Sequence, residues 1–399
     1  DFCLSRGLGD VYKRQQLSIL ISAPRIETRL AALAALRLLA ERAPVEPLLG
    51  ALRDEIEAVR AEAARALGAL GGRAPVEALL GILRTRGEAP ATKEAVVWTL
   101  GALGELAPLQ HLLALLRERD PSLRLAVVQA LGMPGVRAPL DRLLPLMSDR
   151  DARLRVAALR ALSRQERGVP LAPIVAALRD EAADVRAAAA ETLGMLTSEV
   201  LGGEVEVGAP LAALLAALGD DEPRVRAAAA DALGHLGRRG AEVPAEPLSV
   251  ALGDVEDDVR AAAAVALGAG RGDCAMPTVA ALVGALRDER SQVQAAAAQA
   301  LAHLAERGAA EQVLAVLRER ERCADVRVMA IDALCALGSD APAGHLEMVL
   351  ARRDDWRVRA ATARALGTLG LAAPIETLIA AAHGFSPGVR AAAVEALGM

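Results

Sequence analysis

Arginine and aspartate recur in this chain at a fixed spacing that could either bind anions or hold a scaffold together. A motif V-R-x-A-A-A-x-A-L-G repeats along the sequence; its arginine stands eight residues before the glycine, and an aspartate recurs six residues before the arginine. A row of guanidinium groups suits an anionic ligand, because each can donate two parallel hydrogen bonds to an oxyanion. Alternatively, the pairs form a structural ladder that ties the turn of each unit to the next. We favour this Asp–Arg ladder, since functional residues rarely recur once per unit: Arg60, Arg155, Arg186, Arg226 and Arg260, with Asp54, Asp149, Asp180, Asp220 and Asp254.

The histidines and cysteines lack the spacing of a metal centre or a catalytic nucleophile. His235 and His303 occupy one motif position two units apart, which implies a separation of about 20 Å if neighbouring helices pack about 10 Å apart. Metal ligands must instead converge on one ion. The four cysteines form no CxxC pair and indicate free thiols in a reducing compartment. No phosphate-binding loop or nucleophile elbow occurs. We therefore expect no metal, no cofactor and no catalysis from this segment.

Composition narrows the class of partner. The 399 residues are 53% hydrophobic but only 1% aromatic, which suits thin layers of closely packed alanine- and leucine-rich helices. The net charge of −5 argues against nucleic acid, whose binding depends on neutralising phosphates. No uncharged apolar run reaches the ~18 residues that a membrane helix needs. We expect a cytoplasmic protein that binds neither nucleic acid nor membrane.

The motif occurs twelve times, from an anchor position at Arg37 to one at Gly398, in steps of 31 to 40 residues. A sustained period of this length predicts a solenoid. Each unit predicts two helices: an A helix with a proline in its first turn, and a B helix formed by the motif. Positions nine, five and one before the anchor share one stripe, which predicts the core. A glycine inside the B helix costs about 1 kcal/mol relative to alanine, so we infer that the backbone there closely approaches its neighbour.

The motif D-x-x-x-x-V-R-x-A-A-A-x-A-L-G-x-L-G resembles HEAT repeats, specifically the short bacterial subtype known as phycobilisome-lyase-like, over residues ~17–399. The resemblance implies an all-α, right-handed, armadillo-like solenoid of about twelve two-helix repeats, with B helices on the concave face. It also implies a scaffold or regulatory arm that binds a protein or peptide. The alternative is a bilin-lyase-like or other protein-modifying enzyme. A di-iron site like that of deoxyhypusine hydroxylase is disfavoured, because the chain contains no His-Glu pair.

The position three residues before each anchor varies freely, whereas the core positions hardly change. Such variation is typical of a surface without packing constraints, and equally of one that carries partner specificity. Trp98 with arginines around it fits an interface hot spot, although it could instead fill a gap beside a thin core. Farther along, the same face turns acidic, so an extended partner would be basic toward the C-terminal half. The candidate partner-binding residues are Arg65, Trp98, Gln129, Arg160, Arg164, Glu191 and Asp231.

Two segments depart from the repeat. SRGLGDVYKRQ, residues 5–15, matches one reading frame of a transposon-type sequencing adapter, so residues 1–15 are predicted to be non-native; the alternative is a basic targeting arm. Residues 16–399 then form a solenoid without polar cap repeats, which predicts a metagenomic fragment truncated at both ends and monomeric as such. Residues 197–210 lengthen one step to 40 residues. Their Gly-Gly predicts a small hairpin or flexible loop, or a plain insertion that breaks the regularity.

Overall fold

The computed structural model describes residues 12, 14–165, 168–200, 208–270, 276–304, 314, 324–335, 343–352, 354–368 and 374–398. Within these ranges the secondary structure is helical, with connecting turns and no strand. The chain divides into two compact units, Asp1–Pro173 and Ile174–Met399. Apart from residues 12, 14 and 15, the segment 1–15 lies outside the described residues, and its adapter origin stays a prediction.

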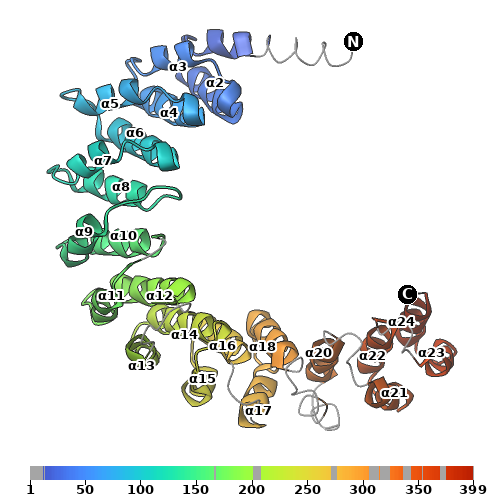
Figure 1. The fold of residues 1–399 in the computed structure, drawn as a ribbon. Helices are drawn as coiled ribbons and strands as arrows, with labels where there is room; N and C mark the ends of the chain where they lie inside the picture. Colours follow the sequence, from blue (N-terminus) through green and yellow to red (C-terminus); the bar gives the residue numbers. More distant parts are fainter. Residues whose placement is uncertain are drawn as a thin grey trace. The chain divides into compact units, whose positions relative to one another are not determined.

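The helices of the first unit alternate between two layers (Figure 1). Consecutive B helices contact one another along the stack, and each A helix contacts the B helix that follows it. Short 3-10 turns follow three of the B helices: η1 (Ala40–Arg42), η2 (Gly71–Arg73) and η3 (Gly104–Leu106). The A helices are α3 (Val45–Ala51), α5 (Val76–Arg84), α7 (Leu109–Leu115) and α9 (Leu140–Leu143). The B helices are α2 (Ile26–Leu38), α4 (Glu57–Gly68), α6 (Pro90–Ala102), α8 (Pro121–Leu131) and α10 (Ala152–Leu162).

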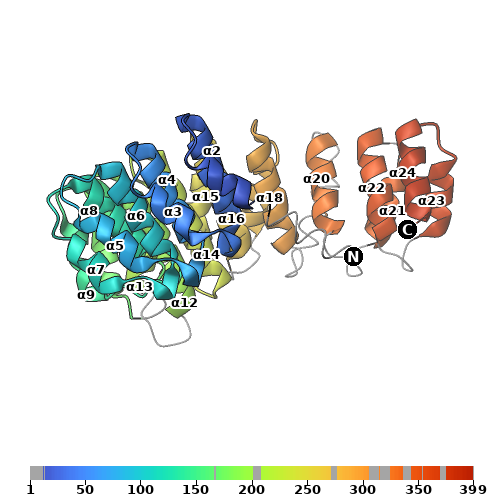
Figure 2. The ribbon, with the colours of Figure 1, turned by 90° about the horizontal axis from the view of Figure 1, so that it is seen from above.

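The second unit, whose boundary falls inside α11 (Leu171–Ala177), repeats this arrangement. Figure 2 shows α22 and α24 side by side, next to α21 and α23, and these four helices contact one another. The A helices are α13 (Gly208–Ala217), α15 (Ala245–Ala251), α17 (Met276–Ala285), α21 (Ala343–Ala351) and α23 (Ile375–Ala382). The B helices are α12 (Ala183–Val200), α14 (Pro223–Arg238), α16 (Asp257–Ala269), α18 (Ser291–Leu304), α20 (Ala324–Cys335), α22 (Trp356–Thr368) and α24 (Pro387–Leu397).

The stripe predicted from the motif is the core of each stack. In α14, Val225, Ala229 and Leu233 stand nine, five and one residues before the anchor, and all three are fully buried. The corresponding residues of α4 are buried to the same extent. Because a single short helix buries too little apolar surface to be stable alone, each repeat depends on its neighbours for this burial.

The inferred close approach at the anchor glycine is confirmed. A Cβ atom placed on Gly101 would lie 2.7 Å from the Cβ of Ala130, and one on Gly268 would lie 2.5 Å from the Cα of Ala300. In both cases the neighbour stands two residues before the next anchor. The placement of the anchor inside the helix is correct in α14 but wrong in α8, which ends at Leu131 and is capped by Gly132.

Prolines end or shift several helices relative to the prediction. Pro44 caps α3 from outside rather than occupying its first turn, and Pro374 does the same for α23. Pro145 lies within an expected A helix, but α9 stops after Leu143 and the chain continues as the 3-10 helix η4 (Leu144–Ser148). A proline lacks the N–H for an α-helical hydrogen bond, and its ring clashes with the preceding turn.

The long insertion is more helical than predicted. Helix α12 continues through Val200 and α13 begins at Gly208, so residues 197–200 and 208–210 belong to helices. Alanine, leucine and methionine in this part favour the helix and let it run past the anchor. Residues 201–207, with the Gly-Gly pair, lie outside the described part of the chain.

Candidate functional site

In the second unit, ladder arginines connect the A–B turns of consecutive repeats. Arg186 donates from Nε and Nη2 to the two carboxylate oxygens of Asp220, at 2.7 and 2.8 Å. Its Nη1 donates to the backbone carbonyl of Asp180, in its own turn, at 2.9 Å. One guanidinium group therefore joins two turns. The same double attachment occurs for Arg226 with Asp254 and Asp220, and for Arg260 with Asp288 and Asp254.

The carboxylates of this ladder also order their own turns. Asp220 accepts a 2.9 Å hydrogen bond from the backbone N–H of Glu222. Hydrogen bonds from Arg186 hold the pKa of Asp220 below its usual value and raise the pKa of the arginine, although partial burial opposes both shifts. Asp254 and Asp288 have lowered pKa values for the same reason. Such pairs stay ionised at neutral pH, and their guanidinium groups are committed to neighbouring carboxylates.

In the first unit, two of the ladder pairs are wider and one arginine takes a glutamate. The Arg29–Asp54 and Arg124–Asp149 pairs are separated by 3.4 and 3.8 Å. Arg60 donates to the backbone carbonyl of Asp54 at 2.8 Å, but its carboxylate partner is Glu88, also at 2.8 Å. Arg155 donates a 2.8 Å hydrogen bond from Nη1 to the backbone carbonyl of Asp149, in its own turn.

Two residues of the second unit depart from the repeat motif and still attach their turns to neighbouring backbone. Gln294, which replaces the ladder arginine in α18, donates to the backbone carbonyl of Asp288 at 2.7 Å. It therefore keeps the contact with its own turn. Trp356 begins α22, and its ring lies 2.7 Å from where a Cβ atom of Gly388 would stand. This tryptophan packs against the backbone of the next repeat.

A second periodic feature runs along the B helices of the first unit. Arg65, Trp98, Gln129 and Arg160 stand three residues before their anchors, and all four are exposed. They lie on α4, α6, α8 and α10, which contact one another in that order. We call these four residues the exposed row. Arg164 is exposed in the turn that follows α10.

Trp98 does not act only as filler for the thin core. Its side chain remains 48% exposed, whereas its neighbours Val97 and Thr99 are buried. The hydroxyl of Thr99 donates to the backbone carbonyl of Ala64 in the preceding B helix, at 3.1 Å. Thr99 thus contributes to the packing between α4 and α6 beside the exposed tryptophan.

The corresponding face of the second unit is acidic at its start. Glu191 of α12 and Asp231 of α14 are exposed, and the two helices contact one another. Neighbouring atoms displace water around Asp231 and raise the pKa of its carboxyl, an effect that His235 and Arg238 partly offset. Loss of hydration likewise raises the pKa of Asp332 in α20. The pKa values of Asp231 and Asp332 are thus raised, whereas those of the ladder aspartates Asp220, Asp254 and Asp288 are lowered.

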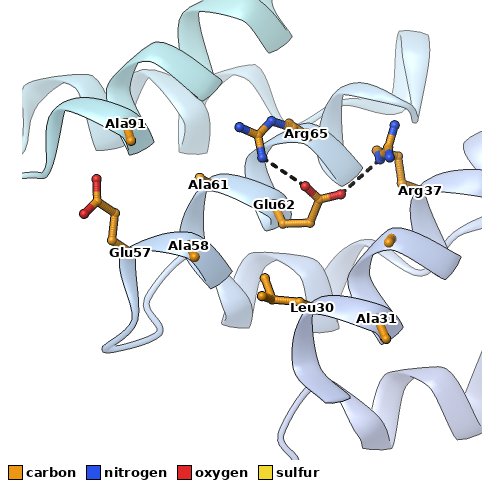
Figure 3. A pocket seen from close by; sticks show the side chains of 10 residues that line it. Leu30, Ala31, Arg37, Glu57, Ala58, Ala61, Glu62, Arg65 and Ala91 are labelled. Atoms are coloured by element: carbon orange, nitrogen blue, oxygen red, sulfur yellow. Dashed lines mark hydrogen bonds and ion pairs between the residues drawn. The ribbon is translucent and has the colours of Figure 1, made fainter. Parts of the chain in front are cut away.

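A groove of about 780 Å³ that sequence reasoning missed lies at the start of the first unit, on the same face as the exposed row (Figure 3). Its floor consists of small or aliphatic side chains from α2, α4 and α6. At one end Glu62 lies between Arg37 and Arg65 and accepts a 3.0 Å hydrogen bond from each. The signal available in the sequence was Ala34, a small residue where the next repeats carry Arg65, Trp98 and Gln129. The floor residues are Leu30, Ala31, Ala34, Ala58, Ala61 and Ala91.

Within the described ranges, no three histidine, cysteine, aspartate or glutamate side chains are placed to hold a metal ion. In the same ranges, no helix has the length and apolar character required to cross a membrane.

Comparison with protein families gives this geometry a context. The family model for HEAT repeats matches residues 15–88, 171–268, 278–367 and 311–398. The chain belongs to the HEAT-repeat family. The matched segments contain α4 and the ladder arginines Arg186, Arg226 and Arg260, whereas α6, α8 and α10 lie between the first two matched segments. No curated protein sequence matches the chain.

Solved structures with the same fold are long HEAT-type solenoids. A structure of Kap95p with RanGDP is 14% identical, with a TM-score of 0.60, over 97% of this chain and 62% of that one. Yeast importin-beta (Kap95p) is 16% identical, with a TM-score of 0.59, over 93% and 58%. Kap121p bound to Pho4p is 16% identical, with a TM-score of 0.55, over 96% and 49%. The chain thus spans about half to three-fifths of the length of these proteins, and at this identity the likeness describes the fold alone.

Proposed function

We propose that this HEAT chain is a non-catalytic scaffold that binds a protein or peptide partner along the exposed faces of its B helices. The observation that carries the proposal is the contrast within each motif. In α6, Val96 is buried and Trp98, two residues later, is exposed. Corresponding exposed positions on the next helices carry different chemistry, as an extended recognition surface requires.

Several features support a protein as the partner. An exposed tryptophan among arginines offers the large contact area and the charged groups that dominate protein interfaces. The fold neighbours include Kap95 in complex with Nup1 and Kap121p bound to Pho4p. By resemblance of its motif we also assign the chain to the bacterial phycobilisome-lyase-like subtype, with a cytoplasmic location. The acidic Glu191 and Asp231 would contact a basic part of the partner.

A photo-crosslinking amino acid placed at Trp98 or at Gln129 tests the location of the surface. The control is the same amino acid at Glu77, an exposed position on the A helix α5. We expect defined crosslinked species, made in the source cell extract, from positions 98 and 129 and none from position 77. Equal or stronger crosslinking from position 77 would contradict a B-helix surface. Trp98→Ala should then weaken binding of the identified partner about tenfold, as loss of a hot-spot side chain does.

A further inference from the structure

We propose that the groove between α2 and α4 takes a short acidic peptide segment with an aliphatic side chain, supplied by a protein partner. This inference rests on the proposed scaffold function and names the chemistry of one part of its surface. The apolar floor of the groove and the ion-paired arginines at its end agree on this occupant.

The groove exists because small side chains line it. Ala31 and Ala58 are exposed on α2 and α4, and Ala34 stands where later repeats carry arginine, tryptophan or glutamine. Leu30 adds an aliphatic surface to the same floor. The groove of about 780 Å³ therefore has an apolar floor and charged side chains at its ends. A leucine or isoleucine side chain seated there would remove apolar surface of both molecules from water.

The two arginines carry more positive charge than Glu62 neutralises. The side chains of Arg37 and Arg65 are 47% and 51% exposed, whereas that of Glu62 is only 15% exposed. Arg37 donates to Glu62 from Nε, and Arg65 donates to it from Nη1. A guanidinium group has five N–H donors, so each arginine keeps donors directed away from the shared carboxylate. Two cations around one anion form a site for a second carboxylate.

Glu57 gives the groove a direction. Figure 3 shows it at the end away from Arg37 and Arg65, beside Ala91. A carboxylate of the partner would be repelled there and attracted at the arginine end. From Glu57 to Arg65, α4 rises about 12 Å, at 1.5 Å per residue. About four residues of an extended peptide cover this length, at about 3.3 Å each. The segment should therefore place its acidic residue about three positions from its aliphatic one.

The test uses the full chain and fluorescein-labelled peptides of about eight residues, long enough to cover the groove. One peptide carries a leucine with a glutamate three positions later, and a second carries the two in the opposite order. Two control peptides, the lysine twins, have the same sequences with lysine in place of glutamate. Fluorescence anisotropy should show binding of at least one glutamate peptide and none of the lysine twins. Equal binding of the twins, or no binding of any peptide, overturns the proposal.

Variants of the chain assign the binding to the groove. Arg37→Gln and Arg65→Gln should each weaken binding of the glutamate peptide about tenfold, a loss of about 1.4 kcal/mol of binding free energy. Ala31→Leu and Ala58→Leu fill the groove from exposed positions without changing charge, and should abolish binding at unchanged helicity. Glu62→Gln removes the competing carboxylate and should tighten binding. A purely structural ion cluster would leave peptide binding unchanged in all five variants.

One control variant and the response of the crosslinked partner separate failure of this proposal from failure of the scaffold function. Arg153→Gln alters an exposed arginine of α10 that pairs with Asp151, outside the groove, and should leave peptide binding unchanged. If the crosslinked partner binds through Trp98 but is insensitive to Arg37→Gln and Ala31→Leu, the scaffold function stands and the groove proposal is overturned. If the partner is also insensitive to Trp98→Ala, both proposals fail.

Discussion

The ladder arginines and the positions three residues before each anchor have the same period but different contacts. Ladder arginines such as Arg226 stand five residues before positions such as Asp231, on the same B helix. Arg226 donates two hydrogen bonds of 2.7 Å to Asp254 of the next repeat. Asp231 has no arginine at hydrogen-bonding distance among the described residues, and reduced hydration raises its pKa.

This difference shows that periodicity alone does not distinguish structure from function. A residue that recurs unchanged in type can have all three of its guanidinium nitrogens hydrogen-bonded by its neighbours, as Arg226 does. A position that recurs with changing type lies where no neighbour imposes a partner. The first kind of position holds the repeats together, and the second kind leaves chemistry available for another molecule.

The largest effect is expected where repeats approach most closely. Gly268→Ala would place a Cβ atom 2.5 Å from the Cα of Ala300, so the two B helices must separate. We expect a loss of about 3 kcal/mol, at the upper end of typical overpacking costs, measured by urea unfolding followed by circular dichroism.

The matched control is Gly284→Ala in α17, where an added Cβ has no atom within 4 Å. This variant should be neutral or gain up to about 1 kcal/mol from better helix propensity. Equal destabilisation by both substitutions would show that close approach is not what maintains the anchor glycine.

The next largest effect tests the ladder itself. The side chains of Arg226 and Asp254 are only 16% and 12% exposed. Arg226→Ala leaves Asp254 without its guanidinium and should cost about 2 kcal/mol, the range for hydrogen bonds to charged groups. Arg124→Ala, whose pair is separated by 3.8 Å, should cost less than half as much.

Arg153→Ala provides the surface control, because this side chain is 66% exposed and pairs within its own turn. We expect a change below about 0.5 kcal/mol in the same unfolding measurement. If the three variants were equally destabilised, the shorter distance of the Arg226–Asp254 pair would carry no energetic meaning.

The ladder also predicts an acid-sensitive second unit. Hydrogen bonds from arginines lower the pKa values of Asp220, Asp254 and Asp288 in the folded chain. A lowered folded-state pKa stabilises the fold above the unfolded pKa, and this stabilisation disappears as pH falls through the folded value. Urea midpoints should therefore drop below about pH 4, and Arg226→Ala should reduce that drop. A pH-independent midpoint in this range would contradict the assignment.

The smallest effect is expected on the exposed face. The pKa of Asp231 is raised, so the folded state loses stability as pH rises through the unfolded and then the folded pKa. Asp231→Asn removes that penalty and should slightly raise the thermal midpoint at pH 7, but not at pH 3. Ladder and face would then respond to pH with opposite signs. A lower midpoint at pH 7 would show that the carboxylate stabilises the fold.

Much of the fold follows from the sequence, because alanine, leucine and valine recur with a helical period. The buried stripe and the close approach of Gly101 to Ala130 are both predictable from the motif. Local exceptions to the repeat were harder to predict from the sequence, because one residue can override the pattern. Pro145 shortens an A helix to four residues, and the run after Gly194 continues as helix to Val200.

For the candidate site, the sequence identifies positions and not partners. Spacing places Arg65, Trp98 and Gln129 on one stripe, and the structure places that stripe on contacting helices. The sequence does not reveal that Glu62 lies between Arg37 and Arg65, since Arg37 and Glu62 are 25 residues apart. Nor does it show that Arg60 takes Glu88 in place of an aspartate, 28 residues away.

The sequence by itself therefore determined the repeat, its two-helix content and the face that each B helix buries, because these depend on local period and hydrophobicity. Only the tertiary structure decided which carboxylate each arginine binds and where small side chains leave a groove. Those features depend on distances between side chains of different repeats, and such distances arise only when the helices pack.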